Sequence, residues 1–370
     1  MQSKSKSIHK SESSKTNRNT LPSLFTLELT TLCNNRCSGC ANIEVPLHRQ
    51  LKQAQHTLFM QNWRGIIDKI IIETRGKAIF RLSGGEPTLH PEFLDIVKYL
   101  DSLNVPHALL TTGKWEKVGK DKLIEAYRNC KNAKGFLVSL HGADSLTHNS
   151  FVESTNKGFQ YTINNIQLAT QKGITVYTNT VITNQNYDKL KDILLLSKKL
   201  GAKYAVFNRF IADEHILLLP TESQLIFAIQ TILGLKNQGY NCRIGNNIPA
   251  CFYPLTNFPT ASGFELCHIS ATGAIRPDNL TPHSFGNIFN GSIATIWQSD
   301  QAKKYRDSIP TDCLQCAALS SCRGGAKSLY SLSNQGRDTL MKGTLDVEKT
   351  QMIIDDKEKR SIELLTLTSD

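Results

Sequence analysis

Residues 30–40 of this 370-residue chain read Thr-Thr-Leu-Cys-Asn-Asn-Arg-Cys-Ser-Gly-Cys. The three cysteines of this stretch, Cys33, Cys37 and Cys40, have the spacing Cys-x3-Cys-x2-Cys. They follow an apolar run, residues 24–29, that predicts a buried strand. Three thiolates can hold an iron–sulfur cluster and leave one iron without a protein ligand, because such clusters are bound by cysteine. Two alternatives stay open on spacing alone, namely three free core cysteines or three of the four ligands of a structural zinc.

The composition narrows the class of protein. The chain has 40% hydrophobic residues and contains no run of 18 apolar residues, so we expect no membrane span. Residues 1–20 lack the apolar core of a secretory signal and predict a disordered tail, which favours a cytoplasmic location. Ten cysteines in such a chain indicate metal or cluster ligands rather than disulfides. The net charge of +11 comes without a dense basic run, so nucleic acid is a minority interpretation.

Short apolar runs alternate with longer helical patterns from residue 22 onward. The predicted strands are residues 24–29, 78–82, 107–111, 135–140, 175–182 and 204–210. The predicted helices between them are residues 59–74, 91–103, 120–130, 158–173 and 187–201. Six repeats of this kind predict parallel strands with right-handed crossovers, and they are too few for a closed eight-unit barrel. We therefore expect an α/β fold with a partial (β/α)6 TIM-type barrel over residues 21–215, whose site lies at the carboxyl ends of the strands.

Polar residues follow each predicted strand. The second strand runs into Gly84-Gly85-Glu86-Pro87, where two glycines allow the backbone to approach a ligand closely. We expect Glu86 to face the site as an anion, for which an ammonium group is the natural partner. The other strand ends carry Thr111-Thr112-Gly113, Ser139, Asn179, Asn208 and Arg209. Each of these residues alone fits a turn or a cap, but their equivalent positions predict one shared site.

The pairing of the Cys33–Cys40 loop with Gly84-Gly85-Glu86-Pro87 resembles the radical S-adenosylmethionine (radical SAM) superfamily over the whole barrel region. The resemblance implies a [4Fe–4S] cluster whose fourth iron is chelated by the amino and carboxylate groups of S-adenosylmethionine. It implies that one electron cleaves this cofactor and that the resulting 5′-deoxyadenosyl radical abstracts hydrogen from a substrate. The cofactor contacts that it implies are Gly84, Gly85, Glu86, Ser139, Asn179 and Arg209.

One residue of the cysteine loop departs from the family pattern. Members of the superfamily usually carry an aromatic residue, stacked near the adenine, just before the third cysteine. This chain has Gly39 at that position. We therefore expect the adenine contacts to come from elsewhere in the chain.

The second half of the chain predicts a linking helix within residues 216–240 and a small cysteine-rich extension at residues 241–330. Residues 265–270 and 274–277 predict a hairpin around Thr272-Gly273. With the spacing Cys313-x2-Cys316-x5-Cys322, the extension resembles the SPASM/twitch domains that carry auxiliary [4Fe–4S] clusters. Structural zinc stays open as an alternative.

The match to a full SPASM domain is incomplete, because Ala326 and Asp278 stand where cysteines are usual. We expect one auxiliary cluster with one of two ligand sets. The first is Cys251, Cys267, Cys313 and Cys316. The second is Cys313, Cys316 and Cys322, completed by Asp278 or by a substrate atom. Cys242 is predicted as a spare ligand, Cys130 as a core residue, and residues 331–370 as a polar tail without chemistry.

These features favour a radical SAM enzyme that acts on a peptide or protein side chain, a peptide maturase. The first alternative is oxidation or rearrangement of a small metabolite. An alternative of another class is a zinc- or cluster-containing nucleic-acid-binding protein. The expected partners are a peptide or small-molecule substrate and an electron donor such as flavodoxin or ferredoxin, with no membrane.

Overall fold

One ten-stranded sheet organises the chain, with the strand order β10-β9-β8-β1-β2-β3-β4-β5-β6-β7. The computed structural model describes residues 21–40, 57–154, 157–212, 216–254, 260–332 and 336–344. The predicted tail at residues 1–20 and most of the predicted C-terminal tail, residues 345–370, lie outside the described residues.

The first seven strands run parallel, and each pairs with the next along the chain. They are β1 (Leu24–Glu28), β2 (Ile79–Ser83), β3 (His107–Thr111), β4 (Ala133–Ser139), β5 (Val176–Ile182), β6 (Tyr204–Arg209) and β7 (Cys242–Ile244). The predicted α/β fold with parallel strands is thereby confirmed. β7 was not predicted, because three residues are too short to show a strand pattern.

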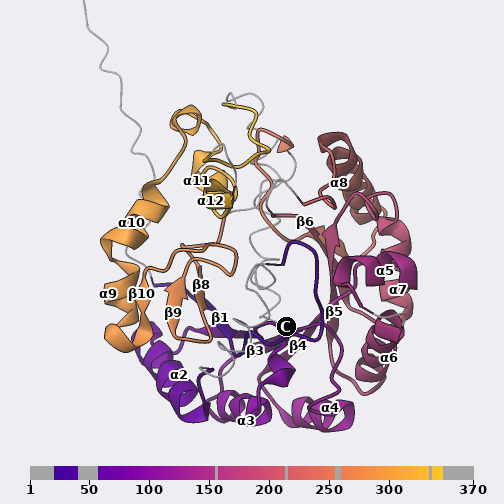
Figure 1. Cartoon of the computed structure of the whole chain (residues 1–370), viewed down its shortest axis with the longest axis vertical. Coiled ribbons are helices and arrows are strands. Elements are labelled where there is room, and N and C mark those ends of the chain that lie inside the picture. Colours follow the sequence, from indigo (N-terminus) through magenta and orange to yellow (C-terminus); the bar gives the residue numbers. More distant parts are fainter. Residues whose placement is uncertain are drawn as a thin grey trace, which may run out of the picture.

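Helices cover the outer face of this curved sheet (Figure 1). They are α2 (Met60–Thr74), α3 (Phe93–Ser102), α4 (Lys120–Asn129), α5 (Ser145–Val152), α6 (Lys157–Gln171), α7 (Leu190–Lys199) and α8 (Glu222–Asn237). In α2 the helical spacing places Trp63, Ile66, Ile67 and Ile70 on one buried face. Thr221 and Gln224 form a capping box that begins α8 where the linking helix was predicted. The sequence analysis missed α5, a short helix with little amphipathic pattern.

The cysteine-rich extension continues the sheet of the barrel. The predicted hairpin is confirmed as β8 (Leu266–Ile269) and β9 (Ala274–Arg276), in which Ile269 pairs with Ile275. β8 also pairs in parallel with β1, and β10 (Gly286–Asn287) pairs with β9. The remaining elements are η1 (Pro87–Leu89), η3 (Ile288–Asn290), α9 (Ile293–Trp297), α10 (Asp300–Asp307), η4 (Thr311–Cys313), α11 (Leu319–Cys322) and α12 (Leu329–Leu332).

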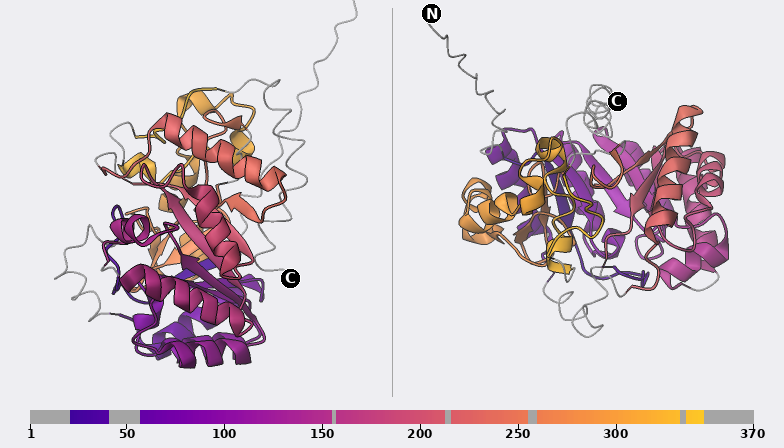
Figure 2. Two further views of the ribbon diagram at one scale, coloured as in Figure 1. Left: turned by 90° about the vertical axis from the view of Figure 1, so that its right-hand side faces the viewer. Right: turned by 90° about the horizontal axis from the view of Figure 1, so that it is seen from above.

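The two ends of the sheet face each other across its opening. Figures 1 and 2 show α11 and α12 of the extension on one side, and β6 and α8 on the other side. The strand that precedes the cysteine loop, β1, pairs with β2 of the barrel on one side and with β8 of the extension on the other. In the part of the chain that the structure describes, no helix is both long enough and apolar enough to cross a membrane.

Candidate active site and auxiliary cluster site

Backbone contacts hold the cysteine loop against the two glycines that follow β2. Gly85 N donates to Thr30 O at 2.8 Å, and Glu86 N donates to Leu32 O at 2.7 Å. A Cβ atom on Gly85 would lie 2.3 Å from the Leu32 carbonyl oxygen, closer than real contacts allow. Glycine is therefore required here, because any side chain would push the cysteine loop away.

Lys114 supports the same loop from the end of β3. Its Nζ donates to Asn34 O at 3.0 Å and to Ser154 Oγ at 2.9 Å, and Asn34 Nδ2 donates to Lys114 O at 2.9 Å. Burial lowers the pKa of Lys114, and nearby thiols and carboxylates oppose that shift. The sequence analysis missed this lysine, although its position directly after Thr111-Thr112-Gly113 was a usable signal.

The end of α5 fixes the other side of the loop. Arg36 N donates to Val152 O at 3.0 Å, and Ser38 N donates to Phe151 O at 3.1 Å. Burial raises the pKa of the Cys37 thiol, and the neighbouring Cys40 and Cys33 thiols raise it further. Three thiols that interact in this way fit an iron–sulfur cluster, since metal binding replaces their protons with positive charge.

Glu86 was predicted to face the site as an anion, and in the structure its carboxylate is held by neighbouring residues. Its side chain is fully buried, and the carboxylate accepts from Thr88 N at 3.2 Å and Thr88 Oγ1 at 2.7 Å. It also accepts from Thr111 Oγ1 at 2.9 Å and Thr112 N at 2.7 Å. Burial raises the pKa of Glu86, while these hydrogen bonds lower it. The carboxylate therefore ties the ends of β2 and β3 together and holds the adjacent glycines in place.

Three polar side chains lie in a row on neighbouring strands of the barrel mouth. Ser139 of β4 pairs with Asn179 of β5 in the sheet register. Asn208 of β6 donates its Nδ2 to Asn179 Oδ1 at 2.6 Å. The structure thus brings together Ser139 and Asn179, whose role as cofactor contacts stays a prediction.

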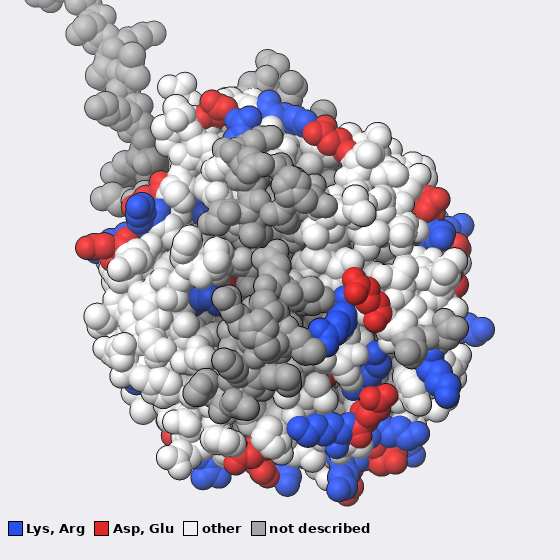
Figure 3. All heavy atoms as spheres, viewed as in Figure 1, with Lys and Arg blue, Asp and Glu red and all other residues white. Residues whose placement is uncertain are grey.

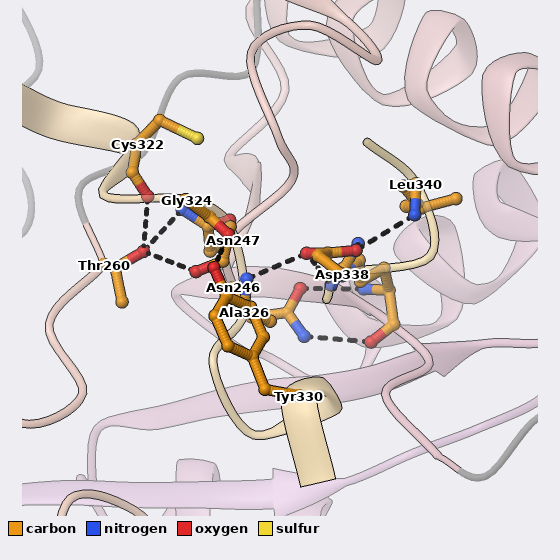
Figure 4. A network of polar contacts seen from close by, with 11 residues as sticks. Asn246, Asn247, Thr260, Cys322, Gly324, Ala326, Tyr330, Asp338 and Leu340 are labelled. Carbon is orange, nitrogen blue, oxygen red and sulfur yellow. Dashed lines mark hydrogen bonds and ion pairs between the residues drawn. The ribbon is translucent and has the colours of Figure 1, made fainter. Parts of the chain in front are cut away.

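Arg209 is occupied by an ion pair instead of facing a cofactor carboxylate. Its guanidinium is 2% exposed and donates to both carboxylate oxygens of Asp338, at 3.1 Å and 2.6 Å. Ala326 N donates to the same carboxylate at 2.8 Å, and Figure 4 shows this network. This ion pair neutralises the Arg209 charge in the structure, and the role of Arg209 as a cofactor contact stays a prediction. Asp338 belongs to the region that was predicted as a polar tail.

A second cysteine site lies in the extension. Four cysteines line one small cavity whose other lining residues are mostly apolar: Cys251, Cys313, Cys316 and Cys322. Cys313 ends η4 and Cys322 ends α11, so short helical turns present two of the thiols. Lys342 N donates to Cys251 Sγ at 3.3 Å, and Met341 and Gly343 line the cavity. Residues 336–344 thus cover a site with four soft sulfur donors, which suits an iron–sulfur cluster.

This grouping differs from both ligand sets that the sequence suggested, although it contains all three cysteines of the second set. Cys267 lies in β8, fully buried and paired with Phe25 of β1, and it does not line the cavity. The Asp278 carboxylate accepts from Leu280 N at 2.9 Å and Thr281 N at 2.7 Å, so it closes a turn instead. Cys242, predicted as a spare ligand, is buried in β7 with its thiol directed to Ile232 O at 3.7 Å.

The family assignment agrees with these two sites. Residues 27–196 match the family model of the Radical SAM superfamily, and residues 261–322 match that of the SPASM iron–sulfur cluster-binding domain. The protein is therefore a radical SAM enzyme, and residues 261–322 form an iron–sulfur domain of the SPASM type. It binds [4Fe–4S] clusters and S-adenosylmethionine, and it cleaves the latter to the 5′-deoxyadenosyl radical.

Three curated proteins that are similar to this chain carry different functional names. The AdoMet-dependent heme synthase of Methanosarcina barkeri is 24% identical over 84% of this chain and 93% of its own length. The subtilosin biosynthesis protein AlbA of Bacillus subtilis is 24% identical over 80% of this chain, which spans 64% of AlbA. The PqqA peptide cyclase of Rhizobium meliloti is 24% identical over 83% of this chain and 82% of its own length.

A solved structure shows the same fold. Streptococcus suis SuiB, in a crystal structure with the precursor peptide SuiA, superimposes with a TM-score of 0.71 at 15% sequence identity. The match covers 87% of this chain and 76% of SuiB.

We expect Glu86→Ala to weaken S-adenosylmethionine binding by at least about tenfold, since hydrogen bonds to a buried carboxylate hold the glycine loop. The hydrogen bonds of the Glu86 carboxylate order the turn that carries Gly84 and Gly85, so its loss should disturb the cofactor site. Isothermal titration calorimetry on the anaerobically reconstituted protein measures the effect. Glu116→Ala, which removes an exposed carboxylate just beyond Lys114, is the matched control and should bind normally. Unchanged affinity in Glu86→Ala would refute this role.

Proposed function

We propose that this radical SAM enzyme abstracts hydrogen from a side chain of a peptide or protein and so acts as a peptide maturase. The observation that carries this proposal is the second cysteine site, four thiols around one cavity on an extension joined to β1 by β8. Among the similar proteins, AlbA serves bacteriocin biosynthesis, a second is named a peptide cyclase, and SuiB was crystallised with a precursor peptide. Together with the matches to the radical SAM and SPASM domains, these similarities support a peptide substrate.

In this proposal the barrel residues have two roles, binding the iron–sulfur cluster and binding S-adenosylmethionine. Cys33, Cys37 and Cys40 hold the cluster that binds S-adenosylmethionine. When bound, that cluster supplies the electron for cofactor cleavage. The backbone of Gly84 and Gly85 approaches the cofactor. Glu86 holds the glycine loop in place, and Lys114 holds the cysteine loop. The polar side chains of Ser139, Asn179 and Asn208 contact the polar groups of the cofactor.

The auxiliary site uses a different ligand set from those that sequence spacing suggested. We assign Cys251, Cys313, Cys316 and Cys322 as its four ligands, because they share one cavity. A cluster with every iron bound to cysteine suits electron transfer rather than direct binding of a substrate. Lys327, 2% exposed, contributes positive charge near Cys313 and Cys322, and burial lowers its pKa to about 8.

An acidic electron donor such as flavodoxin or ferredoxin fits the charge of the chain, which is +11 overall. Figure 3 shows positive and negative side chains mixed along the rim of one face rather than a single basic field. That mixture gives no support to the nucleic-acid alternative, which needs a contiguous basic patch.

A small-molecule substrate is the second candidate function. It is favoured by the similarity to the heme synthase of Methanosarcina barkeri, of which this chain spans 93%. Both candidates use the same cysteine loop, so only the substrate separates them.

Anaerobic turnover with candidate substrates tests the proposal. We expect short peptides encoded beside the gene to stimulate 5′-deoxyadenosine formation and to change mass in proportion to it. With the peptide deuterated at the modified residue, deuterium should appear in 5′-deoxyadenosine. Stimulation by tetrapyrroles or other metabolites, with peptides left unchanged, would replace the peptide assignment by the second candidate.

A further inference from the structure

A third group of metal-ligating side chains lies at the end of β3 that is remote from the cofactor site. Asp101 is in the last turn of α3, His107 is the first residue of β3, and Cys130 directly follows α4. Their ligand atoms all lie within 4.8 Å of one another. Within the described ranges, these residues form the one group of three His, Cys, Asp or Glu side chains with such spacing. Neither cysteine site includes any of them.

His107 carries the second, independent observation. Its side chain is fully buried, and Nδ1 lies 3.1 Å from the carbonyl oxygen of Val105. Nε2 is also buried, and it has no hydrogen-bond partner among the described residues. Donation from Nδ1–H to a carbonyl leaves the lone pair on Nε2, which is the arrangement that metal-binding histidines adopt. A buried polar atom without a partner is rare in proteins, so this nitrogen calls for a ligand.

The other two side chains are oriented by their own neighbours. Asn132 N donates to Asp101 Oδ1 at 2.8 Å, which fixes the carboxylate beside the histidine. Cys130 N donates to Tyr127 O at 3.3 Å, so the end of α4 sets the thiol position. The Tyr127 ring lies 6.1 Å from the His107 ring and packs beside it. Asp101 and Cys130 are partly exposed, which gives an ion a path from solvent and room for a water ligand.

We propose that Asp101, His107 and Cys130 bind one divalent transition-metal ion of the zinc type. Sulfur, imidazole nitrogen and carboxylate oxygen are the three donors that zinc takes in proteins. Zinc bond lengths and tetrahedral angles place such donors about 3.3–3.8 Å apart, so small side-chain movements from the observed spacing complete the site. The ion joins α3, β3 and α4 at the face of the barrel opposite the chemistry, where residues serve stability. This site does not depend on the peptide assignment.

The test uses the cluster-reconstituted holoenzyme, because free cluster cysteines would also take up zinc. One equivalent of zinc chloride is added, unbound metal is removed by desalting, and zinc and iron are counted by mass spectrometry. Zinc-edge X-ray absorption then counts the sulfur neighbours. We expect one zinc per chain with a single sulfur neighbour, and a higher melting temperature than without zinc.

Substitutions of the proposed ligands test whether the zinc ion binds at this site. Cys130→Ser, at a partly exposed position, and His107→Gln should lower bound zinc to background and abolish the zinc-dependent rise in melting temperature, with iron retained. The matched control is Cys242→Ser, which removes another cysteine outside both cluster sites and should keep the zinc. Wild-type protein without bound zinc, zinc retained by Cys130→Ser, or zinc with three or more sulfur neighbours would each overturn the proposal.

Discussion

Cys37→Ala abolishes reductive cleavage of S-adenosylmethionine, with 5′-deoxyadenosine falling to the background of a protein-free control. Two thiolates, Cys33 and Cys40, cannot hold the three irons that must stay bound while the fourth meets the cofactor. The loop itself should keep its fold, because its backbone is held by Thr30, Leu32 and the end of α5 rather than by the Cys37 thiol. The loss is therefore in catalysis and not in stability.

Anaerobic turnover with dithionite, followed by chromatography of 5′-deoxyadenosine, measures this effect. Ser38→Ala is the matched control in the same loop. Its hydroxyl donates to the Glu153 carboxylate at 3.1 Å in an exposed hydrogen bond, and cleavage should continue without it. Sustained 5′-deoxyadenosine production by Cys37→Ala would contradict the assignment of the cysteine loop as the radical-generating centre.

Local pattern predicted the barrel and its first site well. The six predicted strands and five predicted helices lie within a few residues of their observed bounds, because each repeats a short apolar period, whereas the short α5 and β7 were missed. The spacing of Cys33, Cys37 and Cys40, and the adjacent glycines of residues 84 and 85, are likewise short-range features. The glycines were predicted to let the backbone approach a ligand, and the structure adds a second reason, their close approach to the backbone of the cysteine loop.

Contacts between residues far apart in the chain could not be predicted from the sequence. Nothing local indicates that β8 joins β1, so Cys267 seemed available as a ligand until the sheet placed it opposite Phe25. Arg209 and Asp338 are 129 residues apart, so nothing local in the sequence indicated their ion pair. Glu86 was predicted to face the site as an anion with an ammonium partner. In the structure Thr88 of η1 and Thr111, the last residue of β3, donate to its buried carboxylate.

The auxiliary site provides the second large effect, measured as iron and sulfide per chain. A variant in which Cys33, Cys37 and Cys40 are all alanine should keep about four irons, those of one auxiliary [4Fe–4S] cluster. Adding Cys251→Ala to this triple variant should lower the count to about three or fewer, because one iron loses its only protein ligand. Adding Cys267→Ala instead should leave about four, since that thiol lies in the sheet core.

Comparing the Cys251→Ala and Cys267→Ala substitutions tests which ligand set is correct, the one seen in the structure or the one suggested by sequence spacing. Both remove one sulfur atom, but only Cys251 lines the cavity with Cys313, Cys316 and Cys322 and accepts the Lys342 N–H. Loss of iron with Cys267→Ala and not with Cys251→Ala would restore a ligand set that includes β8. Equal retention in both would mean that three thiols suffice for stable binding. An open iron would then remain in the cavity, and the auxiliary cluster could bind substrate rather than only carry electrons.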